Sequence, residues 1–193
     1  AQEIDLLKTR ARTYDDFAIL YRTNAQSRLF EDALKKRGIP YQILSGFSFY
    51  ERKETKDMIC YMRLVVNPAD DLALKRIINE PKRGIGAVTL GKLEALAHVH
   101  ELSLLDILSQ EEISYSLPAK AQSAVHDMVG VIRLCSQEKE NLRVSDIYDQ
   151  LLVKSGYLKA LEAEDTPEAE SRIENLLDFK SFIYDYEKEK ADA

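Results

Sequence analysis

The sequence Asn79-Glu-Pro-Lys-Arg-Gly-Ile-Gly-Ala-Val-Thr-Leu-Gly-Lys-Leu93 holds three of the seven glycines of the chain. Two of them, Gly84 and Gly86, flank one apolar residue directly after the basic pair Lys82-Arg83. Because glycine reaches positive φ at little cost, this spacing predicts a tight turn. Apolar residues at helical spacing follow, so the turn is expected to lead into a helix N-terminus. The free N–H groups of such a terminus bind phosphate well.

The pattern Lys-Arg-Gly-Ile-Gly-x-x-Thr, over residues 82–89, resembles a helix–hairpin–helix element, a module that grips the DNA backbone without reading bases. The residues that would contact a duplex backbone are Lys82, Arg83, Gly84, Ile85, Gly86, Thr89 and Lys92. The same residues also fit a tight helix–helix turn with ordinary solvated lysines, since short motifs match by chance. The pattern alone leaves both interpretations open.

Charge is divided unevenly along the 193 residues. Residues 1–100 carry 17 Lys and Arg against 13 Asp and Glu, a net charge of +4, whereas residues 101–193 carry 10 against 20, a net charge of −10. A basic half beside an acidic half fits nucleic-acid contact confined to one face, and it fits mere solubility as well.

The composition is typical of a globular protein, with 45% apolar and 31% charged residues. Two cysteines, Cys60 and Cys135, are too few for a disulfide framework, so we expect reduced core thiols. No stretch resembles a signal peptide, and no apolar run approaches membrane-spanning length. We therefore expect a cytoplasmic protein that makes no membrane contact.

Hydrophobic periodicity predicts a mainly α chain with a small α/β part at its N-terminus. Short buried strands are expected at 17–21 and 41–44, with a helix between them that reaches about Arg37. Two strands make a poor sheet, so this part is expected to need further strands. After this part, we expect one helix that ends near Val66 and another directly after the glycine turn. Further helices are expected over about 70–79, 102–108, 119–138, 147–154 and 167–188.

The run Arg22-Thr-Asn-Ala-Gln-Ser-Arg28 follows the first predicted strand. Ligands of open α/β sheets bind outside the carboxyl ends of the strands, where this run would lie. Its dense set of donors suits a sugar–phosphate backbone. The alternative is that Thr23 or Asn24 merely caps the following helix, and the residues alone leave both functions open.

No catalytic centre stands out. His98 and His100 lie two residues apart on a predicted helix and so do not share a face. No Cys/His spacing suggests zinc, and no Gly-x-x-x-x-Gly-Lys-Ser/Thr phosphate loop is present in the printed sequence. An autonomous nuclease or nucleotide hydrolase is therefore poorly supported, and we assign no catalytic residue, metal or cofactor to this chain.

An ordered set of segments resembles the UvrD/PcrA-type superfamily-1 DNA helicases over roughly residues 14–185. The matching segments are Ala18-Ile-Leu-Tyr-Arg-Thr-Asn-Ala-Gln-Ser-Arg28, Ile39-Pro-Tyr-Gln-Ile43, Asn67-Pro68, Asp70-Asp71, Arg76-Ile77, Asn79-x-Pro81, Arg83-Gly-Ile-Gly86, Ser155-Gly-Tyr157 and Arg172-Ile-Glu-Asn-Leu176. One departure is visible, because Gly46-Phe47 stands where the family usually has Gly-Gly.

The resemblance implies part of an ATP-dependent 3′→5′ DNA helicase of repair or replication. It matches residues 1–60 to the start of the RecA-like subdomain 2A, 61–175 to the helical subdomain 2B, which swivels and regulates unwinding, and 176–193 to a helix returning toward 2A. It also implies single-strand contacts by Arg22, Thr23, Asn24 and Arg28, and contact of the glycine turn with the duplex ahead of the fork. ATP and Mg²⁺ would bind elsewhere in the parent enzyme, so this fragment alone is expected not to hydrolyse ATP.

A hypothesis of a different class also fits the sequence. The chain would then be a helical protein-interaction module whose acidic half docks a repair or transcription protein. DNA binding, by contrast, would be independent of base sequence and would weaken with salt, because phosphate contacts dominate it. The two hypotheses differ in whether binding depends on the basic glycine turn or on the acidic residues 162–174.

Overall fold

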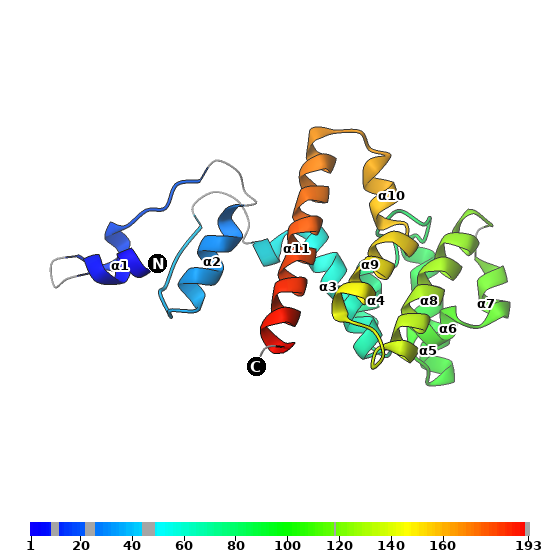
Figure 1. The fold of residues 1–193 in the computed structure, drawn as a ribbon. Helices are drawn as coiled ribbons and strands as arrows, with labels where there is room; N and C mark the ends of the chain where they lie inside the picture. Colours follow the sequence, from blue (N-terminus) through cyan, green and yellow to red (C-terminus); the bar gives the residue numbers. More distant parts are fainter. Residues whose placement is uncertain (9–11, 22–25, 44–48, 118, 192–193) are drawn as a thin grey trace. The chain divides into compact units, whose positions relative to one another are not determined.

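The computed structural model describes residues 1–8, 12–21, 26–43, 49–117 and 119–191 (Figure 1). The chain forms two compact units, Ala1–Lys53 and Glu54–Ala193. Helices dominate the described residues of both, so the predicted mainly α class is confirmed. The subdomain boundaries predicted at residues 60 and 175 rest on the resemblance and stay predictions.

The first unit contains two α-helices and two short 3₁₀ turns in its described part. These are α1 (Gln2–Leu7), η1 (Tyr14–Asp16), α2 (Ser27–Lys35) and η3 (Phe49–Glu51). Gly38 stops the chain from continuing α2, since it takes a positive φ of 63°. The amide of Ile39 then turns back and donates to the carbonyl oxygen of Leu34 at 3.0 Å. This is the glycine-terminated helix end that the sequence predicts.

The strands predicted at 17–21 and 41–44 are not formed among the described residues. Residues 17–21 and 41–43 belong to no helix or strand, and Leu44 lies outside the described residues. A strand needs a neighbour for its N–H and C=O groups, and two short strands are marginal even when paired. The prediction of two strands is therefore wrong for the described residues of this chain.

The second unit is helical throughout its described part. Its helices are α3 (Lys53–Val66), α4 (Asp71–Ile77), α5 (Ala87–His100), α6 (Leu104–Leu108), α7 (Glu111–Ser116), α8 (Ala119–Glu138), α9 (Val144–Lys154), α10 (Tyr157–Glu162) and α11 (Pro167–Ala191). The first residue of α3 is the last residue of the other unit.

Short polar side chains set several helix starts. The Asp70 carboxylate accepts from the amide of Ala73 at 3.0 Å and caps α4. The Ser103 hydroxyl accepts from the amide of Asp106 at 3.1 Å and caps α6. Thr166 accepts in the same way at the start of α11, where proline takes the first helical position. These contacts satisfy amide groups that a helix start leaves without partners.

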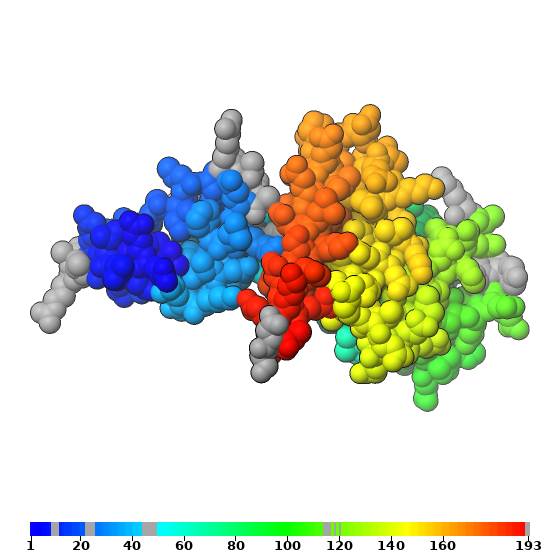
Figure 2. Space-filling view, viewed as in Figure 1, coloured from blue at the N-terminus to red at the C-terminus, as the bar shows by residue number. Residues whose placement is uncertain are grey.

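The core of the second unit forms where these helices pack. Helix α9 packs against α8, α10 and α11, and α6 packs against α4, α5, α7 and α8. Figure 1 and Figure 2 show α9, α10 and α11 side by side on one face of this unit. The largest fully buried side chains are Tyr61, Tyr148, Met58, Leu64, Leu74, Ile77, Leu104, Leu105, Ile107, Met128 and Ile132. Cys60 and Cys135 are buried free thiols, as the sequence predicts.

Two buried hydrogen bonds hold α11 to the rest of this core. The Asn175 amide nitrogen donates to the Glu54 carboxylate at 2.6 Å and so joins α11 to α3. The Tyr148 phenol donates to the carbonyl oxygen of Leu176 at 2.8 Å and joins α9 to α11. Because buried polar groups are costly without partners, these bonds fix the position of α11 as well as stabilise it.

Candidate nucleic-acid interface

The glycine turn joins the end of α4 to the start of α5. The side chain of Asn79 organises its backbone, because the Asn79 Oδ1 accepts from the amides of Arg83 at 2.7 Å and Gly84 at 3.1 Å. Gly84 has a positive φ of 79°, which a residue with a Cβ rarely adopts. Gly86 is the N-cap residue of α5. The sequence thus correctly predicts a glycine turn that leads into a helix.

Successive residues of the turn alternate between the surface and the interior. Lys82, Gly84 and Gly86 are exposed, whereas Arg83 and Ile85 are only 3% and 4% exposed. Within the described residues, no side chain caps the first turn of α5, and that turn carries no acidic residue. The first N–H groups of α5 therefore have no side-chain acceptor, and no acidic residue of that turn offsets the partial positive charge of the helix end.

Two further predicted contact residues lie on α5 beyond this end. Thr89, in the first turn of the helix, is half-buried, and Lys92 is exposed. The exposed parts of the turn and of α5 thus bring together two lysines, two glycines and a helix N-terminus. This arrangement can bind a phosphate backbone.

Arg83 points into the protein, away from any surface ligand. Among the described residues, its two terminal nitrogens donate five hydrogen bonds. The acceptors are the carbonyl oxygens of Ile77, Ile78, Glu80 and Ser155, at 2.9, 3.3, 3.0 and 2.9 Å, and the phenol oxygen of Tyr61, at 2.7 Å. The expected direct contact between Arg83 and DNA phosphate therefore needs correction, because both terminal nitrogens already bond inside the fold and the remaining Nε is buried. The backbone of Ile85 can still lie at the interface, although its side chain is buried.

A second buried polar cluster adjoins Tyr61 on α3. The Asp57 carboxylate accepts from the Tyr157 phenol at 2.8 Å and from the Nε of Arg76 at 2.8 Å. Burial raises the pKa of Asp57 above its ordinary value, and the hydrogen bond from Tyr157 and the charge of Arg76 oppose that rise. The rings of Tyr157 and Tyr61 meet edge to face, with 6.4 Å between their centroids. This cluster connects α3, α4 and α10 next to Tyr61, whose phenol oxygen accepts from Arg83.

The predicted single-strand contacts belong to the first unit. Arg22, Thr23 and Asn24 lie outside the described residues. Arg28 lies on α2, where its Nε is 3.6 Å from the Asp32 carboxylate and its side chain is 11% exposed. The structure therefore gives positions for one of these four residues, and their role stays a prediction.

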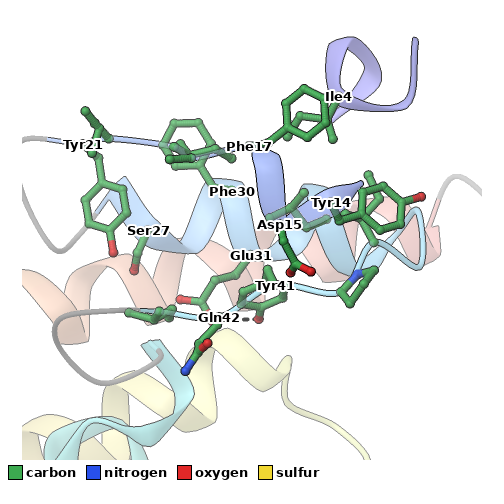
Figure 3. A pocket seen from close by; sticks show the side chains of 17 residues that line it. Ile4, Tyr14, Asp15, Phe17, Tyr21, Ser27, Phe30, Glu31, Tyr41 and Gln42 are labelled. Carbon is green, nitrogen blue, oxygen red and sulfur yellow. Dashed lines mark hydrogen bonds between the residues drawn. The ribbon is translucent and has the colours of Figure 1, made fainter. Parts of the chain in front are cut away.

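A cavity of about 590 Å³ also lies within the first unit, between α2 and the stretches predicted as strands. Its lining is mostly apolar, and Figure 3 shows Glu31 and Tyr41 on its polar side. The Tyr41 phenol donates to the Glu31 carboxylate at 3.1 Å. Burial, together with this carboxylate, raises the pKa of Tyr41 to about 12. We assign no ligand to this cavity.

The described residues hold no group of three or more His, Cys, Asp or Glu side chains able to bind a metal ion. None of the described helices is both long enough and apolar enough to cross a membrane.

Comparison with known proteins gives the family. The family described as UvrD-like helicase C-terminal domain matches residues 1–193. The chain belongs to this family. It is 40% identical over 187 residues to the ATP-dependent DNA helicase PcrA of Staphylococcus aureus, which covers 97% of this chain and 26% of that protein. It is 38% identical over 182 residues to the PcrA of Leuconostoc citreum, which covers 94% and 24%. This UvrD-like domain therefore spans about a quarter of the length of the curated relatives it matches.

The residues that shape the interface of this UvrD-like domain differ from those predicted to contact DNA. The sequence marks Asn79 only as the start of the glycine stretch and of a matching segment, and Ser155 only as the start of another matching segment. One signal was available for Asn79, because asparagine side chains often accept from amides a few residues along in a turn. No signal in the sequence links Ser155 to Arg83, since 72 residues separate them.

Proposed function

We propose that this UvrD-like domain is the part of an ATP-dependent 3′→5′ DNA helicase that holds the DNA backbone at the single-strand/duplex junction. One observation carries the proposal: Lys82, Gly84 and Gly86 lie exposed at the entrance to α5, whose first N–H groups no described side chain caps. Phosphate oxygens match these donors and this charge. The names of the relatives support DNA as the substrate of the parent enzyme.

ATP and Mg²⁺ belong, in this proposal, to other parts of the parent helicase, which acts in DNA repair or replication. This chain regulates unwinding through its grip on the duplex and does not itself hydrolyse ATP. Arg22, Thr23, Asn24 and Arg28 contribute single-strand contacts on the strength of the resemblance. Release of phosphate from ATP by the purified chain alone would contradict the inactive state proposed here.

The test is the affinity of this chain for a fluorescently labelled single-strand/duplex junction, measured by anisotropy at several salt concentrations. We expect Lys82→Ala and Lys92→Ala each to weaken binding equally on two unrelated base sequences. Each should also reduce the slope of log affinity against log salt by about 1, because each removes one phosphate contact. Lys188→Ala is the matched control, since Lys188 is an exposed lysine near the end of α11.

Unchanged affinity in the Lys82→Ala/Lys92→Ala double variant would refute the assignment of the glycine turn to DNA. Arg83→Ala is unsuitable for this test, because it would leave five acceptors of the fold without their donor and would mix loss of folding with loss of binding.

A second candidate function has its own observation. Six acidic residues on and between α10 and α11 are exposed, namely Glu162, Glu164, Asp165, Glu168, Glu170 and Glu174. Such a surface fits a basic partner protein of repair or transcription. Charge reversal over 162–174 should abolish capture of that partner, whereas Lys82→Ala should leave it intact. The opposite pattern would reject this function.

A further inference from the structure

Arg83 poses a physical question, because it carries a permanent charge inside the fold. A guanidinium stays protonated in proteins, and a buried charge is costly unless it is fully hydrogen-bonded. Four of its five acceptors are backbone carbonyl oxygens and the fifth is a phenol. The Nε of Arg83 is buried and has no hydrogen-bond partner among the described residues. None of the five acceptors is a carboxylate, so they compensate the charge through their dipoles.

The dipoles that compensate Arg83 are those of two helix ends. Ile77 is the last residue of α4 and Ile78 its C-cap, and Ser155 is the C-cap of α9. The last carbonyl groups of a helix have no partner within it and carry its partial negative charge. The guanidinium satisfies carbonyl groups of both helices at once. Arg83 thus anchors the turn to two helices that are distant in sequence.

We propose that Arg83 is a positioning residue for the DNA contact and that Asn79 acts with it. Arg83 fixes the turn against α4 and α9, and Asn79 fixes its backbone through the amides of Arg83 and Gly84. Together they hold Lys82, Gly84 and the start of α5 in one geometry at the surface. The identity of the ligand rests on the proposed function, but the positioning itself does not.

The geometry requires arginine and not merely a positive charge. The guanidinium reaches acceptors on α3, at the end of α4 and at the end of α9 through two separate nitrogens. A lysine ammonium has a single nitrogen with three donors, and it cannot span these positions. Arg83→Lys therefore keeps the charge and loses the anchor. A residue that touches phosphate directly would tolerate this exchange far better.

The first measurement is junction affinity for Arg83→Lys and Arg83→Gln, with Lys188→Arg, at an exposed position near the end of α11, as the control. If Arg83 positions the turn, Arg83→Lys and Arg83→Gln should both weaken binding by about tenfold, the loss expected when one charge-assisted hydrogen bond is misplaced. Lys188→Arg should bind as tightly as the unmodified chain. Binding of Arg83→Lys equal to the natural sequence, with Arg83→Gln weakened, would show a direct phosphate contact and overturn the proposal.

The second measurement, hydrogen exchange, needs no DNA. It also tests the turn through variants of Asn79, so the proposal stays testable if the variants of Arg83 fail to fold. Hydrogen exchange should show lost protection of the amides of Arg83 and Gly84 in Asn79→Leu, because both donate to the Asn79 side chain. Asn79→Asp, which keeps the acceptor oxygen, should preserve their protection, as should Lys82→Ala. Equal protection in Asn79→Leu and the natural sequence would overturn the positioning role of Asn79.

The two measurements separate the two proposals. If the unmodified chain does not bind the junction, or if Lys82→Ala binds the junction as tightly as the unmodified chain does, the proposed function fails. Hydrogen exchange then still decides whether Arg83 and Asn79 hold the turn, since Arg83→Lys should lose protection in the turn and Lys82→Ala should not. If exchange is unchanged in both Arg83→Lys and Asn79→Leu, the positioning proposal fails, whether or not the turn binds DNA.

Discussion

Tyr157→Phe removes one hydroxyl from the buried cluster beneath the glycine turn. The Tyr157 phenol donates to Oδ2 of Asp57 at 2.8 Å, and the Asp57 side chain is fully buried. Phenylalanine keeps the ring and its edge-to-face contact with Tyr61, whose centroid is 6.4 Å away. The substitution therefore tests the hydrogen bond with little change in packing.

The expected loss follows from the charge of the acceptor. A hydrogen bond to a charged group contributes about 1.5–3 kcal/mol, and here its loss leaves a buried carboxylate oxygen without that donor. Asp57 keeps its contact with Arg76, whose side chain is 38% exposed and so compensates the charge only in part. For a domain of this size each kcal/mol changes Tm by about 2–4 °C, so Tm should fall by roughly 3–12 °C.

Thermal and urea unfolding followed by circular dichroism measure this loss. Tyr184→Phe is the matched control, because Tyr184 is 45% exposed and its loss should be within about 0.5 kcal/mol. The deficit of Tyr157→Phe should also shrink at acidic pH, since the hydrogen bond favours the charged form of Asp57 and lowers its pKa. A deficit below about 0.5 kcal/mol at neutral pH, equal to that of the control, would refute this account of the cluster.

Two further predictions concern the same unit. Burial raises the pKa of Asp57 above its ordinary 3.8, so the natural sequence loses stability as pH rises from 3.8 through the raised value. We compare the free energy of unfolding of the unmodified chain with that of Asp57→Asn by urea titration. The difference, unmodified chain minus variant, should fall as pH rises through this window, and a rise would contradict the raised pKa. Leu105→Ala should lower the free energy of unfolding by about 2–5 kcal/mol, because Leu105 is fully buried on α6. Leu177→Ala, at a position 52% exposed, should change it by no more than about 0.5 kcal/mol, and similar urea midpoints for both variants would reject the assigned core.

Local signals in the sequence predict most helices of the second unit, but not the six-residue helices α7 and α10. The periodic stretch 119–138 forms α8 with those bounds, and Pro167 begins α11 as the proline rule predicts. Gly156 follows α9 with a positive φ of 80°. These features depend on residues within a turn or two of one another, so a single sequence contains them.

The predicted strands failed for the opposite reason. The stretch 17–21 has the apolar character of a buried strand, but a strand also needs a neighbouring strand to pair with its N–H and C=O groups. Such partners come from other parts of a chain, and no local pattern indicates whether they are in place. The sequence therefore predicts which residues can form a strand, and the presence of a sheet decides whether they do.

The basic pair of the glycine turn shows why a sequence predicts site residues less well than it predicts helices. Lys82 and Arg83 are equivalent by charge, and adjacency suggested that both face the same ligand. The turn instead exposes one and buries the other. The acceptors that bury Arg83 come from residues as far as 72 positions away, so only tertiary packing separates the two roles.

This division changes what the glycine turn can do electrostatically. Two cationic side chains at the turn would neutralise two phosphates, whereas the structure leaves Lys82 at the surface and uses Arg83 to neutralise the ends of α4 and α9. Each neutralised phosphate contributes about 0.9 to the slope of log affinity against log salt concentration. The measured slope should therefore be smaller, by about one phosphate contact, than the slope expected if both Lys82 and Arg83 touched DNA. The remaining attraction must come from Lys92 and from the backbone amides at the start of α5. Because amide donors act only where they are aimed, the proposed binding of DNA by this turn would depend on the shape of the turn as much as on its charge, and Arg83 would contribute to that shape.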